Sequence, residues 1–304
     1  MWPMPSSIRA FAMGSAPAAL PARRPRSPWA LAWLRLLRNR AAMAGLIIVL
    51  AFTATAIIGD RLVPFDPFRQ SLASALRAPG WPHLLGTDEF GRDILSRVVH
   101  GARISSVIGL AGMGFGLVVG GSMGTAGGYL GGRTDQVTMR LIDILLAFPG
   151  MLLALAIASF LGPGLENVLV AVGIYSVPLY ARVVRGSVLT LRTQEFVEAA
   201  RALGASDLRI LWRHILPNAL TPVIVLSSLR FADVILTASG LSFLGLGAQP
   251  PTPEWGAMLA SGRVYLRVAP WVAVFPGVAL ALVVFGFNLL GDGLRDALDP
   301  RMKV

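Results

Sequence analysis

The residue types that carry most protein chemistry are scarce or scattered in this chain. There is no cysteine, which excludes a disulfide framework, a thiolate metal site and a thiol nucleophile. His83, His100 and His214 are far apart in the chain, and no two of them have the spacing of metal ligands. Lys303 is the only lysine and has no glycine-rich phosphate loop around it. We therefore predict no catalytic residue, no metal site and no ATP site in this chain, which is not expected to be an enzyme.

Arg230 and Asp233 are the exception, because they stand inside an otherwise apolar segment. Their spacing of three places both on one face of a helix, where they can form an ion pair. Charges at membrane depth usually face a wet cavity or the interior of a helix bundle. The same pair could instead hold a seam between subunits. The sequence leaves these two interpretations open.

The elements that must position these residues are membrane helices. Hydrophobic residues make up 55% of the chain and charged residues only 14%, which is too apolar for an ordinary soluble domain. A helix of roughly 20 residues crosses the hydrocarbon layer. Six segments meet that length, the fourth of them the least apolar: residues 41–59, 104–127, 140–161, 167–184, 218–236 and 268–290. We predict an all-α polytopic membrane protein with six transmembrane helices.

The distribution of basic residues predicts which side each loop faces. With a cytoplasmic N-terminus, the inner loops carry more than twice as many arginines and lysines as the outer loops. Both termini are therefore predicted to be cytoplasmic. The net charge of +11 follows from this topology, and we expect membrane lipid and no nucleic acid as a partner. The predicted segments are an N-terminal region 1–40, a first transmembrane helix 41–59, a periplasmic segment 60–100, a core 101–291 of five transmembrane helices with a cytoplasmic loop 185–217, and a cytoplasmic tail 292–304.

The N-terminal region contains one short amphipathic pattern. Trp29, Trp33, Leu36 and Leu37 recur at helical spacing beside arginines, which is typical of a helix that lies on the membrane surface. A cleaved signal peptide is the alternative. The following apolar segment is long enough for a full span and has no clear small-residue cleavage site, so we expect an uncleaved anchor.

The second predicted span carries glycine every fourth residue. Such a ridge lets another helix approach closely and gain dispersion contacts in lipid. Close packing within the chain is the favoured interpretation, and a homodimer seam is the alternative. The ridge consists of Gly112, Gly116, Gly120, Gly124 and Gly128.

The loop 185–217 has the pattern of two short helices joined by a tight turn. Phe196, Ala200 and Leu203 share one helical face, and Gly204 then permits a left-handed turn that ends the first helix. The second helix is predicted to be capped by Ser206 and limited by Pro217. Its apolar residues fall at positions i, i+3, i+4 and i+7: Leu208, Leu211, Trp212 and Ile215. An exposed apolar stripe of this kind requires either lipid or the groove of a partner.

The same loop carries a family resemblance. Glu198-Ala199-Ala200, then Gly204, then Ile215-Leu216-Pro217 resembles the ATPase-docking loop of permeases of ATP-binding-cassette importers. By that resemblance Glu198, Ala199 and Gly204 shape the turn, and the neighbouring apolar residues contact the ATPase. Further similarity in residues 85–93, 101–105, 243–251 and 291–301 narrows the family to dipeptide, oligopeptide and nickel permeases, and to the second of their two paired permease subunits.

The resemblance also implies a fold, a membrane and a set of partner subunits. It implies a type I importer permease fold in a bacterial inner membrane, a homologous but different second permease, and an extracytoplasmic solute-binding protein. Two separate ATPase subunits would bind ATP and Mg, so this chain would need no cofactor of its own. Peptides are the expected cargo, with nickel or another small solute as the alternative.

Three other function classes remain as alternatives, and the sequence supports each of them less well than an importer permease. An ion-coupled secondary transporter predicts several acidic or polar residues within the spans, and only Asp233 clearly qualifies. An intramembrane serine protease requires a histidine near a serine at membrane depth, and every histidine here lies outside the predicted spans. A simple channel or assembly factor would not associate with an ATPase.

Overall fold

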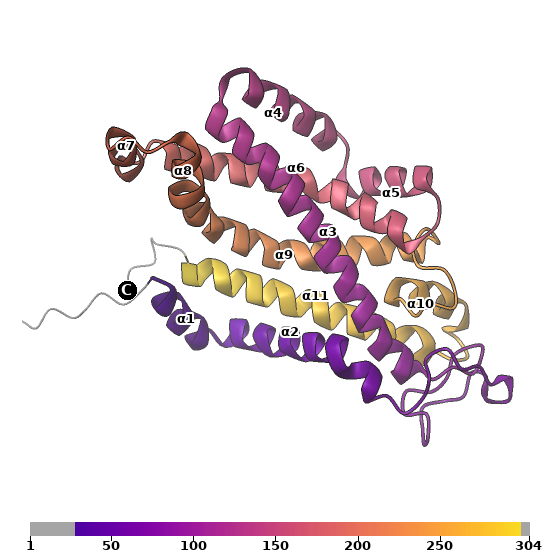
Figure 1. Ribbon diagram of the computed structural model, residues 1–304. Helices are drawn as coiled ribbons and strands as arrows, with labels where there is room; N and C mark the ends of the chain where they lie inside the picture. The colour runs from indigo at the N-terminus through magenta and orange to yellow at the C-terminus, as the bar shows by residue number, and fades with distance from the viewer. Residues whose placement is uncertain (1–27, 299–304) are drawn as a thin grey trace, which may run out of the picture.

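The computed structural model describes residues 28–298 as a bundle of helices (Figure 1). The predictions for residues 1–27 and 299–304 lie outside that range. A five-residue π-helical turn, Leu211–Ile215, joins α8 to α9, and short 3₁₀ turns occupy Gly59–Arg61, Leu72–Ser74 and Arg263–Tyr265. The α-helices are α1 (Pro28–Arg38), α2 (Arg40–Ile58), α3 (Ile94–Leu130), α4 (Gly132–Leu146), α5 (Gly150–Leu161), α6 (Leu165–Arg192), α7 (Glu195–Ala202), α8 (Asp207–Ile210), α9 (Leu216–Phe243), α10 (Trp255–Gly262) and α11 (Trp271–Leu298).

Five helical stretches in the described part are long and apolar enough to cross a membrane, and a bent pair makes a sixth if it counts as one span. The prediction of one continuous helix over 140–161 is wrong. The chain bends there by 87° between α4 and α5. The break falls at Ala147–Pro149, where proline lacks the N–H that an unbroken helix needs and disfavours helical geometry in the residue before it.

Several other helices are longer than predicted. The fourth span, the least apolar in the sequence, is the 28-residue helix α6 and continues to Arg192. Helix α3 begins at Ile94 rather than at residue 104, with Asp93 as its N-cap, and α11 continues to Leu298 rather than ending at residue 290. Hydropathy marks the part of a helix that meets lipid, whereas these helices extend beyond it with polar turns.

The glycine ridge packs within the chain, as predicted. Helix α3 contacts α6 more extensively than any other pair of helices in the described range contact each other. All five ridge glycines are buried. A Cβ atom on Gly112 would lie 2.8 Å from a methyl group of Val172, and one on Gly128 would lie 3.0 Å from Cβ of Val188. The absence of side chains therefore lets the two backbones approach closely.

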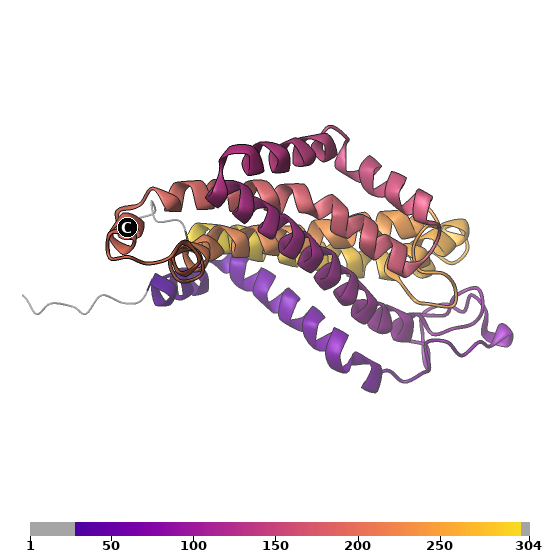
Figure 2. The same cartoon turned by 45° about the horizontal axis from the view of Figure 1, so that its top comes forward.

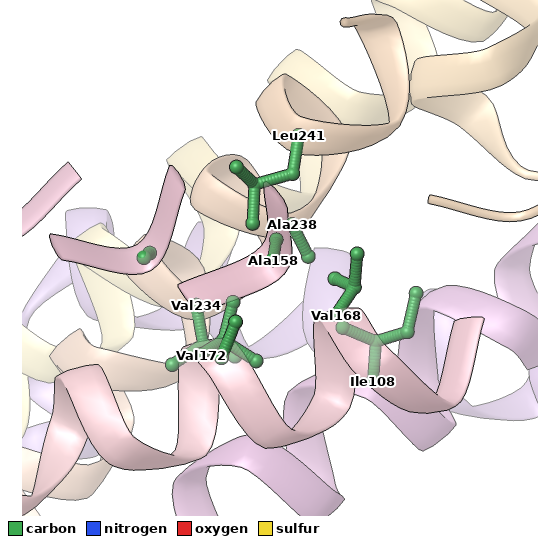
Figure 3. Packing of buried hydrophobic residues seen from close by; sticks show 9 residues of the cluster. Ile108, Ala158, Val168, Val172, Val234, Ala238 and Leu241 are labelled. Carbon is green, nitrogen blue, oxygen red and sulfur yellow. The ribbon is translucent and has the colours of Figure 1, made fainter. Parts of the chain in front are cut away.

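One apolar cluster joins four helices (Figure 3). All its members except Leu241 are alanine, valine or isoleucine, which suits close packing without buried polar atoms. They come from α3, α5, α6 and α9: Ile108, Ala154, Ala158, Val168, Ala171, Val172, Val234, Ala238 and Leu241. This cluster fixes α9, which carries Arg230 and Asp233, against α6.

The two ends of the bundle differ in structure. Helices α1, α7 and α8 and the C-terminal end of α11 gather at one end, whereas α10 and the irregular segment between α2 and α3 lie at the other (Figures 1 and 2). The surface helix predicted near Trp33 is α1, which buries Ala32 and Leu36 against α11 and α2 and leaves Trp33 exposed. Within the described residues, α1, the hairpin region and the end of α11, all of them predicted to be cytoplasmic, thus share one end of the molecule.

Candidate functional site

The hairpin formed by α7, the turn at Gly204 and α8 protrudes from one end of the bundle (Figure 1). Gly204 has φ +79°, the left-handed conformation that the sequence predicts. The N–H of Ala205 donates a hydrogen bond to the carbonyl of Ala200 at 3.1 Å, which closes the end of α7 as in a Schellman motif. Ser206 occupies the N-cap position of α8, but its side chain makes no capping hydrogen bond, so that part of the prediction is wrong.

The second half of the hairpin does not end where the sequence predicts. Pro217 was expected to limit the helix, yet α8, the π-helical turn and α9 form one continuous helical stretch, Asp207–Phe243. Proline lacks an N–H and crowds the preceding turn, and a π-turn widens the helix at that place. The side-chain amide of Asn218 donates to the carbonyl of His214 at 2.6 Å, which satisfies an acceptor within the altered turn.

The predicted apolar stripe separates into an anchored part and an exposed part. Ile215 is fully buried and Leu211 and Ala200 pack partly buried beside it, together with two residues that the sequence analysis missed, Val197 and Ile210. Both missed residues are apolar and both are fully buried. The signal for Val197 is its place one helical turn before Ala200, which packs partly buried against the same cluster. The anchor ties the hairpin to α6 and α9.

The exposed part forms the tip of the hairpin. Leu203 is 89% exposed, Leu208 67% and Trp212 65%, and Phe196 is exposed as well. Glu198 and Ala199 are exposed on α7, and Pro217 is exposed at the start of α9. Large apolar side chains in such positions indicate a surface that a partner or lipid covers. We name Phe196, Leu203, Leu208 and Trp212 the hairpin tip.

Polar contacts connect the hairpin to the ends of two long helices. The hydroxyl of Tyr129, at the end of α3, donates to Oδ1 of Asp207 at 2.6 Å. Arg192, at the end of α6, donates to the carbonyl of Tyr129 at 2.9 Å. One helix further, Arg185 of α6 makes a two-pronged ion pair with Asp135 of α4, at 2.5 and 2.6 Å. Direct contacts thus join the hairpin to α3, α3 to α6, and α6 to α4.

Arg230 and Asp233 form the predicted ion pair on α9. Nη1 of Arg230 donates to Oδ2 of Asp233 at 2.6 Å. A third residue, which the sequence analysis missed, is Tyr175 of α6. Its hydroxyl donates to the same Oδ2 at 3.0 Å, and its ring lies 4.7 Å from the guanidinium carbon of Arg230. The described residues contain no group of three or more histidine, aspartate or glutamate side chains that could hold a metal ion.

Residues 112–304 match the family described as binding-protein-dependent transport system inner membrane component. The chain belongs to this family. Residues 27–79 match a second description, the N-terminal TM domain of oligopeptide transport permease C. The chain is therefore a multi-pass inner-membrane permease subunit of an ATP-binding-cassette importer of the oligopeptide permease C type.

Known permeases are similar in sequence to almost the whole of this chain. A dipeptide transport system permease of Alkalihalophilus pseudofirmus is 47% identical over 277 residues, which cover 91% of each chain. A glutathione transport system permease of Pectobacterium atrosepticum is 47% identical over 279 residues, covering 91% of this chain and 93% of the relative. A di/tripeptide transport system permease of Pseudomonas aeruginosa is 45% identical over 298 residues, covering 96% and 98%.

The fold agrees with a solved transporter. A chain of the MetNI methionine ABC transporter, in an inward-facing conformation, superposes with a TM-score of 0.54 at 20% identity. The superposition covers 66% of this chain and 96% of the MetNI chain. At that identity the similarity concerns the permease fold alone. Permeases of this family work with an ATPase and with a binding protein, so this permease has partners of both kinds.

Proposed function

We propose that this permease forms one half of a pathway that imports short peptides, and that the hairpin tip docks into a groove of an ATPase subunit. A homologous second permease would supply the other half of the pathway. Two ATPase subunits would bind ATP and Mg, and an extracytoplasmic binding protein would deliver the peptide to the end that carries α10. The end that carries the hairpin would face the cytoplasm, as the arginine distribution predicts.

One observation carries the proposal, the contrast between the hairpin tip and its base. Val197, Ile210 and Ile215 are completely buried, whereas Leu203 is 89% exposed and Leu208 67% exposed. A helical hairpin that is fixed at its base and apolar at its tip fits the mode of recognition in which an amphipathic helix lies in a hydrophobic groove. The contacts of Tyr129 and Arg192 would carry force from that groove into the spans.

Peptide is favoured over nickel as the cargo. The three relatives described above are named for dipeptides, for di- and tripeptides and for glutathione, and each aligns with nine tenths or more of this chain. Within the described residues no cluster of metal-binding side chains could serve a metal pathway.

The test is uptake by cells that lack this gene and carry it again on a plasmid. We expect the deletion to reduce uptake of radiolabelled trialanine to the background and leave nickel uptake unchanged, with wild-type levels after complementation. Normal trialanine uptake in the deletion strain, or loss of nickel uptake alone, would contradict the proposed cargo.

A further inference from the structure

Asp233 carries a carboxylate that is exposed at the middle of an apolar helix. Its side chain is 40% exposed, whereas the side chain of its partner Arg230 is only 13% exposed and lies against the ring of Tyr175. Both hydrogen bonds that it accepts from described residues go to Oδ2, so Oδ1 has no donor among them. An ionised carboxylate is an acceptor at both oxygens, so Oδ1 can still accept a hydrogen bond from a further group.

The donors around this carboxylate are fixed before any ligand arrives. Arg230 is held on one side by its own helix, through the spacing of three, and on the other by Tyr175 of α6. Tyr175 packs against the apolar cluster that joins α6 and α9. The arginine therefore balances the charge of the carboxylate from behind, and the group that is open to a ligand is the negative one.

An open groove lies on the same seam between α6 and α9, nearer the hairpin end of the bundle. It has a volume of about 420 Å³ and is lined from α6 by Arg182, Val183, Gly186, Ser187, Thr190 and Leu191 and from α9 by Asn218 and Pro222. Asp233 lies beyond this groove, about 16 Å further along α9 than Pro222. The seam between the two helices continues to Asp233, where Tyr175 of α6 contacts it.

We infer that Asp233 is a binding site for the free N-terminal ammonium group of the cargo as it passes along the α6–α9 seam. The ammonium donates to Oδ1 of Asp233, while Arg230 and Tyr175 hold the carboxylate through Oδ2. An exposed carboxylate within a membrane span, with one oxygen free to accept a hydrogen bond, favours a cationic donor, and a peptide carries such a cation at its N-terminus. This inference rests on the proposed function, since it assigns one end of a peptide to one residue of the pathway.

The test uses the complete importer, with its partner permease, ATPase subunits and binding protein, in proteoliposomes. Asp233→Asn keeps the size of the side chain and removes its charge. We expect trialanine uptake to fall about tenfold or more, since a hydrogen bond to a charged group is lost, while ATPase co-purification and thermal stability stay at wild-type values. Wild-type uptake in this variant would overturn the inference. Failure of the wild-type importer to take up trialanine would overturn the proposed cargo, and this site with it.

A charge exchange separates the site from a structural pair. The double variant Arg230→Asp, Asp233→Arg keeps two opposite charges three residues apart. We expect it to assemble and to remain at least about tenfold impaired in uptake, because the exposed charge is now positive. Uptake restored to near the wild-type level would show that only the ion pair matters, and would overturn the inference.

A single introduced cysteine tests the same site without changing Arg230 or Asp233. This experiment applies even if the Asp233→Asn importer does not assemble. The chain has no native cysteine, so Leu236→Cys introduces a single thiol at an exposed position one helical turn from Asp233. We expect a water-soluble methanethiosulfonate reagent to modify it, trialanine to slow the reaction, and N-acetyl-trialanine, which lacks the ammonium group, to have no effect. Equal protection by both peptides, or protection by neither, would contradict the proposed site.

Discussion

At the scale of single residues, Gly204 is the position where backbone geometry matters most. It has φ +79°, and a Cβ atom there would meet no other atom within 4 Å. A substitution is therefore opposed by backbone strain rather than by crowding, at a cost of order 1–3 kcal/mol for a β-branched residue. We expect Gly204→Val to shift the hairpin tip, so that ATP hydrolysis continues while peptide import per ATP falls severalfold. The ratio of the two rates in proteoliposomes measures this effect.

Two variants control that experiment. Gly204→Asn should retain coupling, because asparagine tolerates the left-handed conformation. Gly162 has φ +89° and equally open surroundings, but lies between α5 and α6, away from the hairpin. Gly162→Val should therefore impose similar strain without uncoupling. A loss of coupling in Gly162→Val as large as that in Gly204→Val would show that general destabilisation, and not the hairpin, is responsible.

At the scale of helices, the α3–α6 interface depends on its glycines. A Cβ atom on Gly120 would lie 3.0 Å from Cβ of Tyr180 and 3.1 Å from the backbone nitrogen of Ala181. Backbone atoms cannot move aside as flexible side chains can, so we expect Gly120→Ala to destabilise the permease by about 1–3 kcal/mol, the usual range for overpacking. The measurement is the midpoint of thermal unfolding in detergent.

Gly114 is the matched control for that substitution. It lies in the same helix, and a Cβ atom there would meet nothing within 4 Å. Gly114→Ala should leave the midpoint unchanged or raise it slightly, because alanine favours the helix. Equal midpoints for Gly120→Ala and Gly114→Ala would argue against a close α3–α6 contact.

Some features of the helices could be predicted from sequence patterns and others could not. The spans, the glycine ridge, the surface helix α1 and the turn at Gly204 could be predicted, because each follows from a local property such as hydropathy, spacing or backbone freedom. The break between α4 and α5 was missed, since a strongly apolar window continues across Pro149. Helix α10 was missed as well, because it is short and follows a proline-rich segment.

Within the candidate site, local patterns were less informative. The pairing of Arg230 with Asp233 follows from their spacing, but Tyr175 belongs to another helix and carries no local signal. The helical period placed Ile215 on one face with Leu208 and Trp212, whereas the π-helical turn rotates it into the core. Contacts between distant segments, and a change of helical period at Pro217, cannot be obtained from a regular pattern.

At the scale of the whole molecule, the hairpin lies at one end of the bundle, and α10 and the segment before α3 lie at the other (Figure 1). The Tyr175–Arg230–Asp233 cluster lies on the long helices α6 and α9. Arg192 and Tyr129 link the hairpin to α6 and α3, which contact each other along their length. Movement at the tip would therefore alter the α6–α9 seam without unfolding either helix.

The central claim is that the hairpin tip contacts the ATPase, and site-specific crosslinking tests it most directly. Leu203→Cys and Trp212→Cys place single thiols on the tip of a chain that has no cysteine, and Val264→Cys places one on an exposed residue beside α10 as the control. We predict that a short thiol-reactive crosslinker joins both tip variants, but not the control, to an ATPase subunit, and that the crosslinks block peptide import. Tip variants that never capture an ATPase subunit, in membranes where peptide import continues, would contradict the account.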